Sequence, residues 1–384
     1  MPLLTNQRHL FDIPREVAYL NCAFMAPQLK AAHAAGEEAL RQKAQPWRMT
    51  STDFFTQSEE TRALFARLIG AEADDIAFIP SVSYGMAVAR LNLPLRAGQT
   101  VVIAAEEFPS GVYAWREAAR ESGAEMVVVP RPADGDWTAA MLAAIDGRTG
   151  VVLASQTHWI CGGHMDLVAL SAKAKAVGAA LVLDITQSGG VVPLNVKTID
   201  PDFVAAASYK WLMGPYALGF LYAAPRHHRG VPLEHGWVNR EGAQDFRRLT
   251  ECREEFQPGA RRFDMGERSS FHLMPMARAA LEQLLAWGAN DIARTLGHMT
   301  AHIAAEASVR FGAEAAPEAL RSPHYLGLRL PGGLPEGFAQ ALAARNVHVS
   351  LRGDRVRVTP HLYNDDEDIG RLFEALGDSL RRAA

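Results

Sequence analysis

Short apolar runs alternate with longer amphipathic segments through the first 225 residues of the chain. The runs are rich in Val, Ile, Leu and Ala, which is typical of strands buried within a sheet. The expected strands cover residues 101–104, 125–129, 151–154, 181–183, 203–207 and 218–222. The expected helices cover residues 28–43, 53–68, 112–122, 137–145 and 166–177. This alternation predicts an α/β fold with a mostly parallel sheet and helices on both faces.

The pattern changes after residue 225. Turn-forming and charged residues dominate 225–262, which indicates a hinge between two domains. The elements expected beyond it are helices at 275–310 and 365–382 and strands at 325–330, 347–351 and 355–358. We therefore expect a large α/β domain at 16–255 and a smaller α+β domain at 256–384, which residues 1–15 join.

Composition and charge exclude several classes of protein. The 384 residues are 48% apolar and 21% charged, which is usual for a soluble globular protein. A net charge of −4 gives no basic surface for nucleic acid and no polybasic membrane patch. No apolar run approaches the roughly 18 residues of a membrane helix, and no export signal is recognisable. Three scattered cysteines do not form a disulfide framework, so we expect a cytoplasmic protein with reduced thiols.

Two ionisable residues stand at the ends of neighbouring apolar runs. Asp184 ends the run at 181–183, and Lys210 follows the run at 203–207. Open α/β sheets bind ligands where the carboxyl ends of their strands converge. A lysine and an acid at that edge suit pyridoxal phosphate, because the lysine forms a Schiff base and the acid keeps the pyridine nitrogen protonated. The residues alone also allow a helix-capping Asp184 and a solvated Lys210.

The surrounding sequence decides between these readings. DITQSGG, followed by ASYKWLMGPYALGFLY, resembles the class V aminotransferase branch of the fold-type I pyridoxal phosphate enzymes. Cysteine desulfurases, kynureninases and isopenicillin-N-epimerase-like proteins belong to that branch. The resemblance implies a sheet of the seven-stranded type and pyridoxal 5'-phosphate as the cofactor. It also implies Lys210 as the Schiff-base lysine, Asp184 at the pyridine nitrogen and Gln187 at the ring oxygen.

Further cofactor contacts follow from the same resemblance. Residues 79–87 place hydroxyl groups where a strand turns into a helix, and a helix N-terminus suits a phosphate, although a serine there can also be a plain helix cap. Phe108 follows another strand and is expected to stack on the cofactor ring, unless it is ordinary core. The resemblance assigns the phosphate to Ser81, Val82 (through its backbone) and Ser83, and further cofactor contacts to Ser208 and Tyr209.

The substrate and a second subunit are expected to contact other segments. Arg357 stands six residues before Tyr363, the family spacing for the arginine that binds the α-carboxylate, although a strand arginine can also be solvated. Arg352 is a weaker candidate for this role. The remaining assignments are Trp159 and Asn21 to the substrate, and Ser269 and Ser270 to a segment that reaches the neighbour's phosphate in a homodimer.

One segment at 156–164 carries residues of open meaning. His158, Cys161 and His164 stand three positions apart, but three candidates around a Gly-Gly turn do not make a structural zinc pattern. We therefore predict no metal site. His158 is interpreted as a hydrogen-bonded structural histidine, with a role as a supporting base left open. Cys161 is expected to border the cofactor.

The reaction is less specified than the cofactor. Residues 347–363 hold no cysteine to accept sulfur, and Tyr209 stands where desulfurases carry histidine, which argues against a cysteine desulfurase. We favour transamination of a small α-amino acid. The alternatives are C–S or β-elimination, kynureninase-like hydrolysis and epimerisation, or a non-catalytic binding protein of the same fold. A nicotinamide enzyme is disfavoured because no G-x-G-x-x-G opens a helix.

Overall fold

A seven-stranded sheet forms the centre of the structure, a computed structural model that describes residues 2–383. Its strands are β2 (Ile76–Ile79), β3 (Thr100–Ala104), β4 (Glu125–Val129), β5 (Thr149–Ser155), β6 (Ala180–Asp184), β7 (Phe203–Ala207) and β8 (Gly219–Ala223). Their order is β2-β8-β7-β6-β5-β3-β4. Only β8 runs antiparallel to its neighbours β7 and β2. The predicted α/β fold with a mostly parallel, seven-stranded sheet is therefore confirmed.

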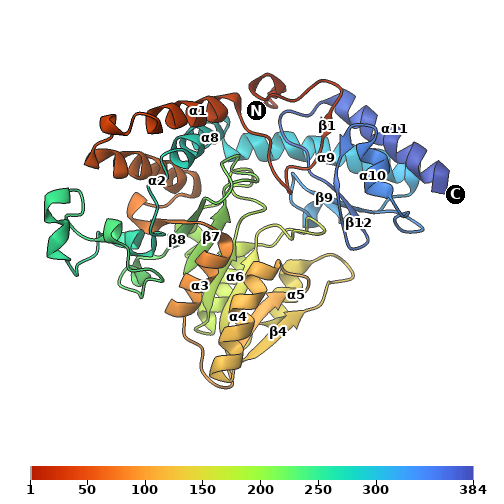
Figure 1. Ribbon diagram of the computed structural model, residues 1–384. Helices are drawn as coiled ribbons and strands as arrows, with labels where there is room; N and C mark the ends of the chain where they lie inside the picture. The colour runs from red at the N-terminus through yellow and green to blue at the C-terminus, as the bar shows by residue number, and fades with distance from the viewer. Residues whose placement is uncertain (1, 384) are drawn as a thin grey trace.

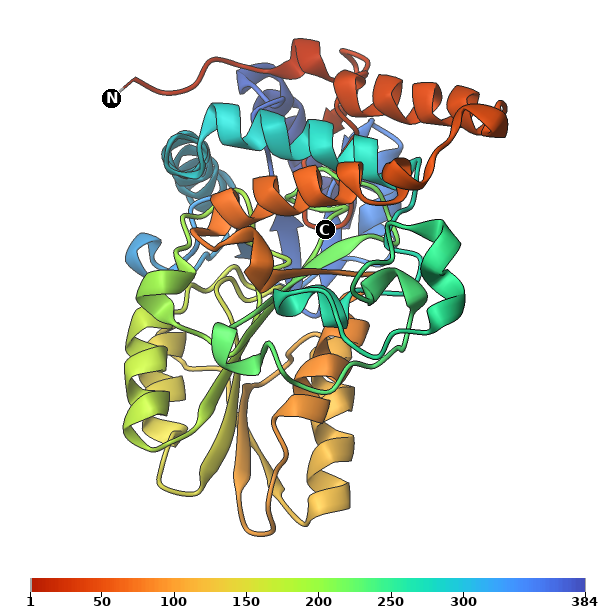
Figure 2. The ribbon, with the colours of Figure 1, turned by 90° about the vertical axis from the view of Figure 1, so that its left-hand side faces the viewer.

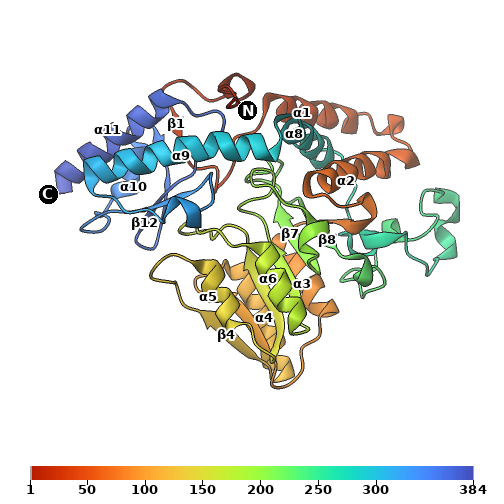
Figure 3. The same ribbon diagram turned by 180° about the vertical axis from the view of Figure 1, so that it is seen from behind.

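Helices cover both faces of this sheet because successive side chains of each strand point to opposite faces. In β3, Val101 and Ile103 belong to a cluster with residues of α3 (Val82–Asn92) and α4 (Pro109–Ser122). Figure 1 shows these two helices in front of the sheet. Val102 and Ala104 belong to the cluster on the other face, where Figure 3 shows α5 and α6. The helices that contribute to this second cluster are α1 (Lys30–Lys43), α2 (Thr56–Ile69), α5 (Trp137–Ala144), α6 (Leu167–Ala176), α7 (Val196–Ile199), α8 (Leu273–Trp287) and the first turns of α9 (Ala289–Phe311).

The C-terminal elements gather beside the large sheet (Figure 1), and a separate apolar cluster holds them together. Its elements are α9 (Ala289–Phe311), β9 (Leu326–Arg329), α10 (Phe338–Ala343), β10 (Val347–His348), β11 (Ser350–Arg352), β12 (Arg355–Val358) and α11 (Asp366–Ala383). β11, β12 and β9 form an antiparallel sheet, and β10 pairs with the N-terminal strand β1 (Ala18–Tyr19). The division at residues 255 and 256 stays a prediction. The packing crosses this boundary in both directions. Ala18, from the expected large domain, packs in the C-terminal cluster, whereas α8, from the expected small domain, packs on the large sheet.

Two expected elements differ from the structure. The helix expected at 275–310 is broken at Gly288, whose φ of 78° and ψ of 127° end α8 and turn the chain into α9. The apolar periodicity continues across the break, so only the glycine signals it. The strand expected at 347–351 is also divided, since β10 pairs with β1 and β11 pairs with β12. Of the helices that the structure describes, none is both long and apolar enough to span a membrane.

The expected hinge at 225–262 is an irregular segment whose end is firmly packed (Figure 2). It contains short 3-10 helices at Pro225–His227, Trp237–Asn239, Phe246–Glu251 and Gly259–Phe263. Phe263 is buried against the large sheet, and the next residue, Asp264, forms a buried ion pair with Arg62 at 2.8 Å. The Asp264 carboxylate also accepts the backbone N–H of Phe78 in β2. These bonds fix the segment's end to the sheet rather than leaving it free to bend.

Candidate active site

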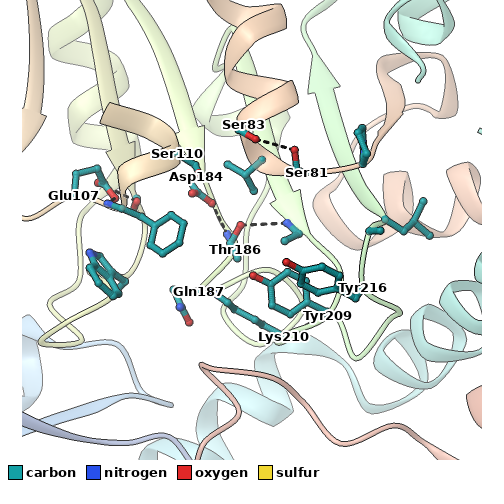
Figure 4. A pocket seen from close by; sticks show the side chains of 18 of the residues that line it. Ser81, Ser83, Glu107, Ser110, Asp184, Thr186, Gln187, Tyr209, Lys210 and Tyr216 are labelled. Carbon is teal, nitrogen blue, oxygen red and sulfur yellow. Dashed lines mark hydrogen bonds between the residues drawn. The ribbon is translucent and has the colours of Figure 1, made fainter. Parts of the chain in front are cut away.

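A cavity of about 340 Å³ opens at the carboxyl edge of the large sheet (Figure 4). Its walls come from the segments that follow β2, β3, β5, β6 and β7 and from the turn before β8. The parallel strands bring these segments together because their carboxyl ends share one edge. The predicted site residues that line this cavity are Ser81, Val82, Ser83, Phe108, Trp159, Asp184, Gln187, Tyr209 and Lys210.

Lys210 reaches the cavity three residues after the end of β7, and only 7% of it is exposed. Its Nζ lies 5.3 Å from the centre of the Phe108 ring and 5.6 Å from that of Tyr209. Burial is the main cause that lowers the pKa of Lys210 to about 8, and the charges of Arg357 and Arg352 add to it against the opposing charge of Asp184. A large fraction of the amine is therefore neutral near pH 8, as nucleophilic attack on an aldehyde requires.

Asp184 is the last residue of β6 and is buried in the opposite wall of the cavity. Its Oδ1 accepts the backbone N–H of Thr186 at 2.9 Å. Burial raises the pKa of Asp184, and the bonds from Thr186 and the charge of Lys210 offset this only in part. Among the described residues no cation forms a salt bridge with this carboxylate. A buried acid of this kind is stabilised by a cation that enters the cavity.

The N-terminus of α3 closes another side of the cavity. Ser81 caps this helix, since its Oγ accepts the backbone N–H of Tyr84, and its Oγ lies 2.8 Å from the Oγ of Ser83 (Figure 4). The first turn of a helix leaves backbone N–H groups without partners and carries the positive end of the dipole. Ser81, Val82 and Ser83 therefore form an anion site of the kind that binds a phosphate.

Aromatic and amide side chains line the remaining walls. The Phe108 ring meets the Trp159 ring edge-on at 5.3 Å, and the Tyr209 ring lies 4.7 Å from that of Tyr216. Gln187 donates from Nε2 to the carbonyl of Ala23 and accepts at Oε1 from Trp211. The second hydrogen of the Gln187 amide nitrogen makes no bond within residues 2–383, so this amide has one donor left for a ligand.

Arg357 is buried beside the cavity rather than in its wall. Its Nε donates to Ser350 Oγ at 2.8 Å, and its Nη1 donates to the carbonyl of Trp159 at 3.0 Å and to the hydroxyl of Tyr325 at 3.1 Å. Its guanidinium and that of Arg352 each lie 5.9 Å from the Trp159 ring. Both arginines thus reach the Trp159 side of the site, and Arg357 is held there more tightly.

Besides Arg357, four predicted residues lie outside this cavity. Ser208 is buried and donates from Oγ to the carbonyl of Pro215 at 2.6 Å, which pins the turn after Lys210. Asn21 is buried beside β12 through a bridge to Thr359. Ser269 and Ser270 line a different cavity, of about 620 Å³, which shares only Ala217 with the first. Within one chain these two serines therefore do not contribute to the site around Lys210.

Sequence reasoning missed three residues that shape the cavity. Thr186 accepts the backbone N–H of Ala207 at its Oγ1 and so ties the end of β6 to the end of β7. Glu107 is buried in the wall, accepts from Ser155 Oγ, and has its pKa raised by burial. Tyr216 enters from the turn before β8. Thr186 and Glu107 could have been predicted from their positions just after the ends of strands. The position of Tyr216 in the cavity wall depends on how the Gly-Pro turn folds back, which the sequence does not indicate.

The segment at 156–164 does not bring His158, Cys161 and His164 to the cavity, and Cys161 does not border it as expected. His158 is a buried, hydrogen-bonded histidine whose Nε2 lies 3.0 Å from the carbonyl of Ala105. Within the part of the chain that the structure describes, no group of three or more His, Cys, Asp or Glu side chains could hold a metal ion.

Comparison with known families identifies the chain. The family model described as aminotransferase class V matches residues 28–369. The chain belongs to the class V aminotransferase family. Pyridoxal phosphate is the cofactor of this family, which confirms the prediction from the sequence.

Relatives of this class V chain differ in their reactions. It is 26% identical over 337 residues to an uncharacterised aminotransferase of Bacillus subtilis, covering 83% of each chain. It is 29% identical over 274 residues to the kynureninase of Deinococcus radiodurans, covering 68% of this chain and 64% of the relative. The cysteine desulfurase of Thermococcus onnurineus NA1 has the same fold, with a TM-score of 0.85 at 19% identity over 99% and 100% of the two chains. The family is thus established, whereas the reaction is not.

The residues around the cavity fit pyridoxal phosphate on their own chemistry. A buried lysine and a buried acid, neither of them in a salt bridge with another described residue, lie in one cavity. A helix N-terminus with two serine hydroxyl groups supplies an anion site, and Phe108 supplies an aromatic face. The lysine suits the aldehyde of the cofactor and the acid suits its ring nitrogen. The helix N-terminus suits the phosphate, and Phe108 suits the face of the ring.

Proposed function

We propose that this class V enzyme transfers the amino group of a small α-amino acid to a keto acid, with Lys210 as its catalytic residue. The observation that carries the proposal is the Lys210 amine, which has a pKa lowered to about 8 and no salt bridge among the described residues, in a cavity that also holds the buried Asp184. Cys22, Cys161 and Cys252 do not line that cavity, and burial raises the pKa of Cys22, whose thiol lies near Lys210, which disfavours the thiolate needed to accept sulfur.

Each residue of the site has a separate task in this proposal. When bound, pyridoxal phosphate supplies an aldehyde that captures amines and a ring that accepts electrons. Lys210 would hold the aldehyde, Asp184 the ring nitrogen, Phe108 the ring face, and the first turn of α3 the phosphate. Once the substrate's amino group has taken its place, the freed Lys210 amine removes the proton from the substrate Cα as a general base. Its lowered pKa leaves it able to accept that proton near neutral pH.

Product analysis with the holoenzyme tests the proposed reaction. The protein is incubated with a panel of L-amino acids, including kynurenine, together with 2-oxoglutarate or pyruvate as the acceptor. We expect the donor's keto acid and the acceptor's amino acid in equal amounts. Ammonia or sulfide without amino transfer would instead establish a lyase, side-chain cleavage of kynurenine a hydrolase, and loss of chirality alone an epimerase. A protein that retains the cofactor and converts no substrate would be a binding protein.

Arg357 is proposed to clamp the α-carboxylate of the substrate, since its guanidinium is held beside Trp159 by Ser350 and Tyr325. We expect Arg357→Gln to raise KM about 10- to 100-fold, the value of one charge-assisted hydrogen-bonded contact, with a smaller change in kcat. Arg352→Gln is the matched control and should raise KM less. Steady-state kinetics on the best donor gives both constants. Equal losses in the two variants would refute the assignment to Arg357.

We further propose that the protein has no sustained cysteine desulfurase activity. Cys22 is fully buried, and burial raises the pKa of its thiol despite the nearby charge of Lys210. Cys161 and Cys252 line other cavities. Incubation with L-cysteine and a reductant should therefore give no equimolar alanine and sulfide over many turnovers. If both products accumulate together, and Cys161→Ser or Cys22→Ser abolishes them, the proposal fails. Sulfide with pyruvate would indicate β-elimination, which needs no protein thiol.

A homodimer, in which Ser269 and Ser270 approach the neighbour's phosphate, remains part of the proposal. The large cavity beside these serines contains exposed apolar side chains, among them Leu40 and Trp237, and it borders the active site at Ala217. A surface of this kind suits contact with another subunit.

A further inference from the structure

A smaller cavity, of about 170 Å³, is lined in part by the 156–164 segment and takes no part in the proposed reaction. Cys161 lines this cavity and not the one that holds Lys210. Its other walls include Trp137, Arg131, Arg355 and Pro317. Cys161 is thus a thiol with access to a cavity of its own.

The thiol is paired with His158 in a defined geometry. Cys161 Sγ lies 3.3 Å from His158 Nδ1, and His158 Nε2 lies 3.0 Å from the carbonyl oxygen of Ala105. A carbonyl only accepts, so Nε2 carries the ring proton, and the lone pair of Nδ1 faces both the thiol and the backbone N–H of Ile160, which donates to it at 3.4 Å. The imidazole is held in this orientation by stacking on Trp137, with ring centres 4.5 Å apart and an angle of 11° between the planes. His158 is therefore placed to take the thiol proton.

The charges around the pair favour the thiolate. Burial by itself would raise the pKa of Cys161, but the hydrogen bond and charge of His158 outweigh it and bring the pKa to about 7, with help from Gly163 N–H and Trp137. Glu107 faces His158 and Arg131 faces Cys161, and each favours the charged pair, whereas Tyr325 remains protonated because burial raises its pKa to about 12. A thiolate stabilised by an adjacent histidine and arginine is the reactive form of cysteine.

Hydrogen bonds and close packing fix the backbone around Cys161, so an atom added to its sulfur needs the space of the adjoining cavity. His158 N–H donates to the carbonyl of Gly163, and Gly162 N–H donates to the carbonyl of His158. A Cβ placed on Gly327 would lie 2.7 Å from the Cα of Cys161, which shows how closely the next strand packs. The segment cannot retreat, but the cavity has room for an oxygen atom, because one water occupies about 30 Å³ of liquid.

We propose that Cys161 is a modification site, at which hydroperoxides oxidise the thiol to a sulfenic acid with His158 as the base. His158 takes the thiol proton, and the thiolate sulfur attacks one peroxide oxygen. The S–O bond forms as the O–O bond breaks, so the sulfur loses two electrons and the peroxide gains them. The leaving group, a hydroxide from hydrogen peroxide or an alkoxide from an organic hydroperoxide, takes the proton from His158 and departs as water or alcohol.

Trapping of the sulfenic acid in the holoenzyme tests the proposal. The protein is treated with hydrogen peroxide and dimedone at pH 7, and mass spectrometry of peptides measures the adduct at all three cysteines. We expect Cys161 to be labelled first, ahead of the exposed Cys252, and the buried Cys22 to stay unlabelled. Labelling of Cys252 at an equal or higher rate would overturn the proposal.

The variant His158→Gln tests the base. A glutamine side chain keeps an N–H that can donate to the carbonyl of Ala105 but has no basic nitrogen at Nδ1. Without the histidine, burial raises the pKa of Cys161 beyond that of an ordinary thiol, so labelling at pH 7 should fall about tenfold or more. His164→Gln, three positions beyond Cys161, is the control and should change it little. An unchanged rate in His158→Gln would contradict the role of His158.

A measurement on the wild type keeps the proposal testable if His158→Gln does not fold. The rate of iodoacetamide labelling at Cys161 is followed from pH 5 to 10. Because the pKa of this thiol is lowered, the rate should reach half of its maximum near pH 7. A midpoint at pH 8.5 or above would show that the thiol is not activated and would overturn the proposal.

Discussion

Lys210→Ala is expected to lower turnover about 1,000-fold or more while the protein keeps its fold. The lysine would serve twice, in holding the cofactor aldehyde and in moving the substrate Cα proton, and general-base catalysis alone contributes about 100- to 10,000-fold. Its Nζ makes no hydrogen bond or salt bridge within the described chain, so the substitution breaks no such contact. Turnover of the best amino acid by the variant, reconstituted with pyridoxal phosphate, gives the loss.

Circular dichroism and a thermal melt separate this catalytic loss from unfolding. Lys173→Ala, which removes an exposed lysine from α6, is the matched control and should retain the wild-type rate. If Lys210→Ala retains a near wild-type rate, Lys210 is not the catalytic lysine, and the proposed function loses its main support.

Asp184→Asn is expected to lower the rate of Cα-proton exchange about 100- to 1,000-fold, with a smaller effect on cofactor retention. A carboxylate opposite the ring nitrogen keeps that nitrogen protonated, and a neutral amide of the same size cannot do so. A loss of this size is typical when an enzyme loses one preorganised group that stabilises charge developing in the transition state. NMR follows the exchange of the substrate Cα proton in D₂O. This exchange reports removal of the Cα proton independently of the later steps of the reaction.

The comparison variant for Asp184→Asn is Glu107→Gln. Glu107 is buried in the same cavity, where its carboxyl group accepts hydrogen bonds from Ser155 Oγ and from the backbone N–H of Phe108. Its exchange rate should fall much less. Unchanged exchange in Asp184→Asn, with the cofactor bound, would exclude the proposed role of Asp184.

Local patterns along the chain were sufficient to predict the large sheet and much of the candidate site. Short apolar runs mark the strands, and Asp184 and Lys210 stand where such runs end, so their meeting at one edge follows from a parallel sheet. The serine-rich turn at the start of α3 was recognisable for the same reason, because a helix N-terminus has a local signature.

What the sequence did not reveal depends on contacts between distant segments. The pairing of β10 with β1 joins residues more than 300 positions apart, and no local pattern announces it. The burial of Arg357 against the Trp159 carbonyl likewise depends on how the C-terminal region meets the large sheet. Cys161 faces its own cavity because Gly162, with a φ of 75°, and Gly163 turn the chain away from Lys210.

Borohydride reduction of the holoenzyme, followed by peptide mapping, tests most directly whether Lys210 holds the cofactor. Reduction makes the link between lysine and cofactor permanent, and mass spectrometry then identifies the modified peptide. The structure leads us to expect the cofactor on the peptide that contains Lys210, with none at the exposed Lys173 or Lys197. Attachment at a different lysine, or a cofactor that is bound but never becomes linked to Lys210, would contradict the account.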